Sequence, residues 1–138
     1  SKPHKITSQV KYAPSGVDET AGILLQNKED EMASIILSLH AKQPKRGTIS
    51  FDKGYIEIFE YPRGDEAVIT YTETGEKEVI TAGNTEKALE YEIEDMEKAV
   101  LENFDMHLNY TKDVMDIMTF IRNEWGMYYP EEEGREIL

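Results

Sequence analysis

Residues 47–60 read "GTISFDKGYIEIFE", and this stretch has the pattern of two short strands joined by a tight turn. After the turn, Tyr55 and Phe59 alternate with Ile56 and Ile58, a period of two that is typical of a β-strand. Gly54 closes the turn, where glycine adopts a positive φ angle at little cost. The stretch therefore predicts a β-hairpin with strands over 47–51 and 54–60.

Strand patterns continue on both sides of this hairpin. The charged sequences "NKEDE" and "ETGE" are typical of turns that join two further pairs of strands. Because most connections are this short, the strands are expected to pair mainly in antiparallel fashion. Together with the hairpin, the sequence predicts about seven strands, and those outside the hairpin cover 4–12, 19–26, 32–41, 66–72 and 77–82.

The last third of the chain changes to a helical period. Asn84 or Thr85 is suited to cap a first helix, and a second is expected over 112–125 with Thr111 as its N-cap and Gly126 just after its end. Each helix has one apolar stripe. The first stripe consists of Leu89, Ile93, Met96, Val100 and Phe104, and the second of Val114, Ile117, Met118, Ile121 and Trp125.

Seven strands followed by two helices predict an α+β fold, an open sheet with both helices on one face. We expect one domain over residues 1–130 and a partly disordered tail over 131–138. Two helices cover only one face of such a sheet, yet both alternating sets of side chains in 32–41 and 54–61 contain apolar residues. A strand that is apolar on both faces is usually buried on both. The second face is therefore expected to meet another domain or another subunit, as in a homodimer.

Composition excludes several classes of function. The chain has 138 residues, a net charge of −13 and no cysteine, so thiolate nucleophiles, disulfides and Cys-ligated zinc are absent. The short basic cluster "KQPKR" does not provide the basic face that nucleic acid requires, and an anionic membrane surface is disfavoured for the same reason. No apolar run reaches the length of a membrane span. A cytoplasmic location is the expectation.

Recognisable catalytic motifs are missing. The sequence has no G-x-G-x-x-G or Walker-type loop and no G-x-S-x-G, and its three histidines lie far apart without metal-ligand spacing. The acidic runs 29–31 and 131–133 are interpreted as solvated. The residues alone predict neither a metal site nor a catalytic set.

Two strand ends carry candidate binding residues. Tyr61, Pro62 and Arg63 combine an aromatic ring, a rigid residue and a guanidinium, which suits the rim of a pocket for a polar ligand. His40 and Lys42 follow the strand that begins at residue 32. For both places, an ordinary exposed turn is the competing and commoner interpretation.

Four segments in order resemble the C-terminal domain of the glucose–fructose oxidoreductase, inositol dehydrogenase and MocA-type dehydrogenases. They read "SGVDETAGILLQ" (15–26), "GTISFDKGYIEIF" (47–59), "ALEYEIEDM" (88–96) and "VMDIMTFIRNEWGMYYPEE" (114–132). The entry "GVD" followed by "LLQ" is most similar to the dihydrodiol and xylose dehydrogenase branch. The resemblance covers residues 4–132.

The resemblance implies a two-part enzyme in which a Rossmann domain binds NAD or NADP and a domain like this one shapes the substrate pocket and forms a subunit interface. The family's G-x-G-x-x-G, E-K-P and D-x-x-x-H motifs are absent here. The chain is thus expected to represent the C-terminal portion of such an enzyme, with the catalytic residues upstream. Alone it is expected to bind no nicotinamide cofactor and to be inactive.

The resemblance also assigns substrate contacts. It places Tyr61, ahead of Pro62, in the wall of the pocket, with a second contact near Gly83 and Asn84. Tyr61 is expected to stack on a sugar, polyol or cyclic diol, while Arg63 or Asn84 bonds its hydroxyl groups. Two alternatives remain, namely a stand-alone binding or scaffold module that uses the same sheet, and a regulatory ligand-binding domain.

Overall fold

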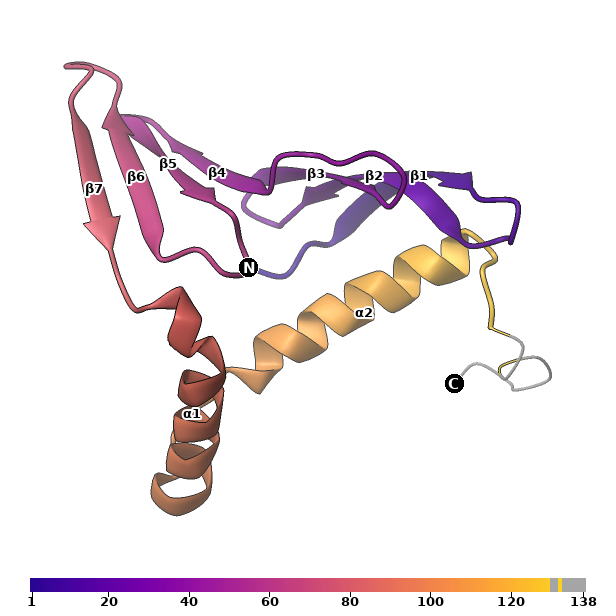
Figure 1. The fold of residues 1–138 in the computed structure, drawn as a ribbon. Helices are drawn as coiled ribbons and strands as arrows, with labels where there is room; N and C mark the ends of the chain where they lie inside the picture. The colour runs from indigo at the N-terminus through magenta and orange to yellow at the C-terminus, as the bar shows by residue number, and fades with distance from the viewer. Residues whose placement is uncertain (130–131, 133–138) are drawn as a thin grey trace. The chain divides into compact units, whose positions relative to one another are not determined.

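The computed structural model of the chain describes residues 1–129 and residue 132. The chain divides into two compact units. The first unit comprises Ser1–Lys42 and His107–Leu138, and the second unit comprises Gln43–Met106. Each unit has its own antiparallel sheet and one α-helix (Figure 1).

The first unit is built on a three-stranded sheet. Strands β1 (Lys5–Tyr12), β2 (Asp18–Gln26) and β3 (Met32–Ser38) are hydrogen-bonded in that order, and both pairs are antiparallel. Direct pairing places alternate residues of the three strands on a common face. That face carries the apolar side chains of Ile6, Val10, Ala21, Ile23, Leu25, Ile35 and Leu37.

Helix α2 (Leu108–Glu124) packs against this face of the sheet (Figure 1). Its contact is concentrated at the C-terminal end, where Ile121 is 4% exposed and Ala21 of β2 is 2% exposed. Just after the helix, the Trp125 Nε1 donates to Ser8 Oγ at 2.9 Å, and the Tyr12 hydroxyl donates to the Trp125 carbonyl at 2.6 Å. Trp125 therefore joins the end of α2 to β1 by two hydrogen bonds.

The second unit is built on a four-stranded sheet. Strands β4 (Arg46–Phe51), β5 (Gly54–Phe59), β6 (Glu66–Tyr71) and β7 (Lys77–Thr81) pair in sequence order, all antiparallel. A short 3₁₀ helix, η1 (Thr85–Lys87), then leads into α1 (Ala88–Glu102). The hairpin read from residues 47–60 is confirmed, with Phe51 paired to Gly54.

Gly54 is required for a reason other than the expected one. It does not have a positive φ angle, so the predicted turn conformation is wrong. It lies instead at the start of β5, where a Cβ atom would come within 2.3 Å of the Thr70 carbonyl oxygen in β6. That distance is far inside a normal contact, so only glycine allows β5 and β6 to approach this closely.

One face of the four-stranded sheet is apolar and has little cover. We call it the isoleucine face. The register aligns Ile49, Ile56 and Ile69 in one row across three strands. The side chains of Phe51 and Ile49 are 62% and 55% exposed. The isoleucine face consists of Ile49, Phe51, Ile56, Ile58, Ile69 and Ile80.

The prediction of an α+β fold with antiparallel strands is confirmed, but the prediction of one seven-stranded sheet is wrong. Strand β3 ends at Ser38 rather than at residue 41, because the chain bends there and the Ser38 hydroxyl accepts a hydrogen bond from the Ala41 N–H at 3.0 Å. Pro44, which lacks an N–H, lies in the connection to β4. Strands β3 and β4 consequently belong to different sheets.

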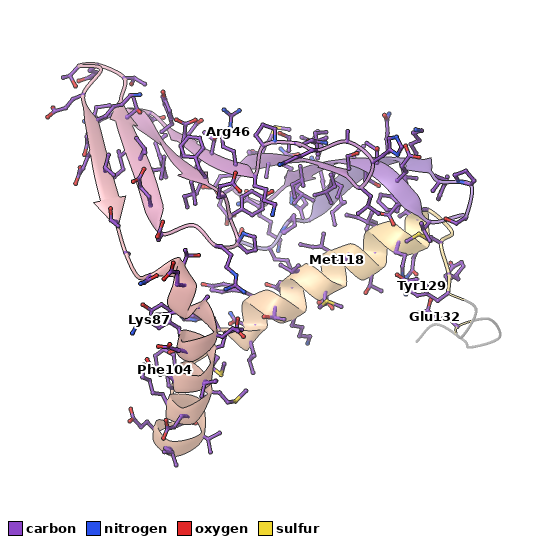
Figure 2. All side chains as sticks on the ribbon, viewed as in Figure 1. Arg46, Lys87, Phe104, Met118, Tyr129 and Glu132 are labelled. Carbon is purple, nitrogen blue, oxygen red and sulfur yellow. The ribbon has the colours of Figure 1, made fainter. Side chains whose placement is uncertain are left out.

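The two helices differ from the prediction in their packing and ends. Only α2 lies on a sheet of its unit, and the side chains of α1 lie apart from the four-stranded sheet (Figure 2). The stripe of α1 stays exposed, with Val100 at 73% and Ile93 at 69%. Phe104 falls beyond the end of α1, and α2 begins before Thr111, so the predicted Thr111 cap is wrong. The predicted role of Gly126 is confirmed, since its φ is +63° directly after the helix.

In the part of the chain that the structure describes, no helix combines the length and the apolar character that crossing a membrane requires. The single domain over 1–130 stays a prediction, because two compact units can belong to one folding domain. The tail predicted over 131–138 lies outside the described residues except for Glu132.

Candidate functional site

The three candidates Tyr61, Arg63 and Asn84 come from two loops, and both loops lie at one end of the sheet of the second unit. The Glu60 N–H donates to the Lys45 carbonyl at 2.7 Å, which ties the exit of β5 to the entry of β4. The Ala82 N–H donates to the Asp65 carbonyl at 2.9 Å, which ties the exit of β7 to the entry of β6. The two loops that carry the candidates therefore leave the same end of the sheet.

The loop after β5 is a compact turn. Glu60 has a φ of +54°, and the Arg63 N–H donates to its carbonyl at 3.1 Å. The Tyr61–Pro62 peptide bond is cis. Tyr61 is 47% exposed and Arg63 is also exposed, so both side chains are accessible to a ligand.

Asn84 has a structural role at the end of β7. Its Oδ1 accepts the Glu86 N–H at 2.9 Å and caps η1, which confirms the predicted cap. The Asn84 Nδ2 donates to no residue that the structure describes, so this amino group stays available for a ligand. Tyr91 lies against the preceding Gly83, where an added Cβ would be 3.7 Å from the Tyr91 ring. Tyr91 thus packs against the loop that leads into η1.

His40 and Lys42 belong to the first unit. Both are exposed in the bend that follows β3, and neither has a hydrogen bond or ion pair within the described residues. Their role as substrate contacts stays a prediction, as it does for the three candidates of the second unit.

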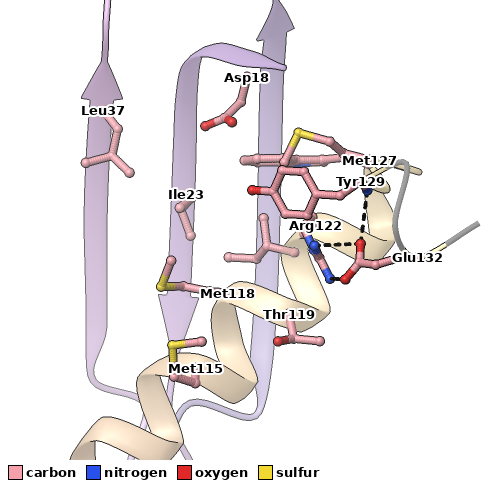
Figure 3. Close-up of a pocket in the computed structure, with 12 residues that line it drawn as sticks. Asp18, Ile23, Leu37, Met115, Met118, Thr119, Arg122, Met127, Tyr129 and Glu132 are labelled. Atoms are coloured by element: carbon pink, nitrogen blue, oxygen red, sulfur yellow. Dashed lines mark hydrogen bonds and ion pairs between the residues drawn. The ribbon is translucent and has the colours of Figure 1, made fainter. Parts of the chain in front are cut away.

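A pocket that the sequence did not predict lies in the first unit, between α2 and strands β2 and β3 (Figure 3). Its cavity volume is 460 Å³. Ile23 and Leu37 of the sheet face Met115 and Met118 of the helix across it. The residues after the helix, Trp125, Met127 and Tyr129, complete the apolar part of the wall.

An ion pair closes one side of this pocket. Arg122 donates to both carboxylate oxygens of Glu132, at 2.9 and 2.8 Å, and its guanidinium lies 5.0 Å from the centre of the Tyr129 ring. The hydrogen bonds from Arg122 to Glu132, more than the neighbouring charges, raise the pKa of Arg122. The interpretation of the acidic run 131–133 as solvated is therefore wrong for Glu132, which holds the segment after α2 against the helix.

Asp18 supplies a second carboxylate to the pocket wall (Figure 3). The register between β1 and β2 shifts after Lys11, so that Tyr12 pairs with Asp18 and not with Glu19. Such a bulge changes the face to which the following side chains point. Asp18 is thereby placed on the side of the sheet that α2 covers, while Glu19 forms an ion pair with Lys11.

The sequence predicts only a packing role for the lining residues Met118, Ile121 and Trp125. It assigns no role to Arg122, Met127 and Tyr129. A signal for this region exists in the sequence: "WGMYYP" places the only tryptophan, a methionine and two tyrosines directly after an amphipathic helix. Aromatic and thioether side chains beyond a helix end are suited to close a cavity over the adjacent sheet.

The described residues contain no group of three histidine, aspartate or glutamate side chains placed to hold a metal ion. A comparison of the sequence with protein-family models and with curated proteins finds no match.

Proposed function

We propose that this chain is the substrate-binding and subunit-interface part of an NAD(P)-dependent oxidoreductase that acts on a sugar, a polyol or a cyclic diol. The single observation that supports the proposal best is the isoleucine face with the two loops beside it. An apolar sheet face of this extent is unstable in water and needs a covering layer. A second copy of the chain is the proposed cover, and a homodimer would result.

The substrate would bind at the end of the four-stranded sheet. The Tyr61 ring offers an apolar surface for the C–H face of a sugar or cyclic diol. The Arg63 guanidinium and the Asn84 Nδ2 are hydrogen-bond donors within the same end of the sheet and suit hydroxyl groups. NAD or NADP would supply the hydride chemistry from a Rossmann domain in the same polypeptide, because this sequence has no loop that could cradle a dinucleotide.

Oligomeric state tests the interface. Sedimentation of the purified chain should show a dimer, and Ile49→Lys should shift it to monomer by placing an ammonium group in the isoleucine face. Thr48→Lys is the matched control, since the neighbouring residue points to the opposite face. A wild-type chain that stays monomeric at every concentration would contradict the interface.

Substrate binding is tested separately by adding glucose, xylose, inositol or trans-cyclohexane-1,2-diol and following amide signals by NMR. Shifts confined to Tyr61, Arg63 and Asn84 would support the site, and Tyr61→Ala should abolish them. The isolated chain should not bind NADH or NADPH.

The alternative, a stand-alone binding or scaffold module, uses the same sheet without redox chemistry. The coding sequence upstream of Ser1 separates the two proposals. A continuous reading frame that encodes G-x-G-x-x-G and E-K-P favours the enzyme, whereas a start codon immediately upstream favours the module. A cytoplasmic location is part of the enzyme proposal and is compatible with the absence of cysteine.

A further inference from the structure

We infer that the pocket between α2 and the three-stranded sheet is a second binding site, and that it takes a small organic cation with an apolar body, such as a protonated amine on a ring. This site lies in the first unit and is made of residues other than the substrate candidates of the second unit. Its existence does not depend on the proposed oxidoreductase.

The charges in the wall select for a cation. Arg122 is neutralised by two hydrogen bonds to Glu132, so this pair contributes no net charge. Among the described residues of the wall, Asp18 is the one further acidic or basic side chain. Among the residues that the structure describes, none forms an ion pair or a side-chain hydrogen bond with the Asp18 carboxylate. Within the described part of the chain, the wall of the pocket therefore carries one negative charge without a cationic partner.

The rest of the wall fits an apolar body. Ile23, Leu37, Met115 and Met118 provide aliphatic and thioether surface on both sides of the cavity. The rings of Trp125 and Tyr129 add polarisable surface, which favours cations in partly desolvated places. A cavity of 460 Å³ lies within the range of small-molecule sites. A ligand with a single ammonium group and a ring matches both the volume and the charge.

The β-bulge makes the carboxylate part of this site. Without the register shift after Lys11, Glu19 would lie opposite Tyr12, and its longer side chain would occupy the place of Asp18. In the structure Glu19 is already paired with Lys11. The bulge thus separates two adjacent acids, one bound to a lysine and one left for the pocket.

Trp125 makes the test direct, because it is the only tryptophan in the chain and lines the pocket. Its fluorescence is recorded while the chain is titrated with cyclohexylmethylamine, cyclohexylmethanol or cyclohexanecarboxylate at neutral pH. These three probes share a ring and differ in charge. The amine is expected to bind about tenfold more tightly than the alcohol, as a charge-assisted hydrogen bond predicts, and the carboxylate more weakly than both.

Variants assign the preference to Asp18. Asp18→Asn should bring the affinity for the amine down to that for the alcohol, whereas Glu124→Gln, which removes an exposed carboxylate of α2 outside the pocket, should leave it unchanged. Met118→Ala should weaken the amine and the alcohol by the same factor, since it removes apolar contact only.

Methyl NMR locates the ligand. The signals of Met115, Met118 and Met127 should shift, while that of Met96 in α1 should not. The inference is overturned if no probe binds, if the alcohol binds as tightly as the amine, if Asp18→Asn keeps the preference, or if Met96 shifts with the others.

Discussion

The two units contain the same parts, an antiparallel sheet and one amphipathic helix, but only one of them uses its helix to cover its sheet. In the first unit Ile121 of α2 is buried and Trp125 is hydrogen-bonded to β1. In the second unit the stripe of α1 and the isoleucine face both stay largely exposed. An amphipathic pattern therefore specifies that a surface must be covered, without specifying what covers it.

The largest expected effect tests this contrast directly. Ile121→Ala removes a buried side chain and should lower the free energy of unfolding by about 3 kcal/mol. Ile93→Ala in α1 removes an exposed one and should change it by less than about 0.5 kcal/mol. Urea unfolding followed by far-UV circular dichroism measures both variants. A comparable loss for Ile93→Ala would mean that the stripe of α1 is covered in solution.

The second test concerns the attachment of α2 to its sheet. Ser8→Ala leaves the Trp125 Nε1 without its acceptor and should cost about 1.5 kcal/mol, because a partly buried donor is left unpaired. Thr7→Ala is the control, since the neighbouring residue points away from the helix and is exposed. Urea unfolding monitored by Trp125 fluorescence should show a larger loss of unfolding free energy for Ser8→Ala than for Thr7→Ala. Equal losses in the two variants would argue against this hydrogen bond.

The sequence predicted the elements far better than their assembly. The bounds of six strands agree within one residue, because alternation and turn residues are local signals. The division into two sheets was not predicted. It depends on a bend at Ser38, and the apolar residues of 32–39 continue past this position as if the strand did not end there. The pocket was missed for a related reason: the bulge at Asp18 and the return of Glu132 to Arg122 are tertiary features.

In the second unit, the start of the helical segment provides a smaller test. Asn84→Ala removes the cap of η1 and should cost about 1 kcal/mol. Asn84→Asp should retain most of the free energy of unfolding. Thr85→Ala should retain all of it, because the Thr85 side chain makes no hydrogen bond within the described residues. Hydrogen exchange at the Glu86 amide is the measurement, and unchanged protection in Asn84→Ala would contradict the cap.

The smallest expected effect is the pH dependence of the contact between the N-terminus and α2. The Lys2 Nζ lies 2.7 Å from the Asp116 Oδ2 and 3.1 Å from the Asp113 Oδ1. The hydrogen bond that Lys2 donates to Asp116 lowers the pKa of Asp116, and the hydrogen bonds that Lys2 donates to both aspartates raise the pKa of Lys2. The contribution of Asp116 to the free energy of unfolding is then present above its unfolded pKa of about 4 and is lost as the pH falls.

The corresponding contribution of Lys2 is present below its unfolded pKa of about 10.5 and is lost as the pH rises further. The groups are exposed, so the effect should be small and sensitive to salt. Denaturant unfolding of the wild type and of Asp116→Asn across this pH window measures it. A difference between them that persists in acid would rule out the ion pair as its source.

Gly54 should help to align this sequence with distantly related ones. Its place is dictated by the 2.3 Å approach to the Thr70 carbonyl, which no other residue tolerates. Surface positions around it can vary, but replacing this glycine would separate β5 from β6. A change in the two-residue spacing from Phe51 would disturb the pairing of β4 with β5. Distant descendants of the same ancestor should therefore retain a glycine here, which makes position 54 a fixed point for aligning them.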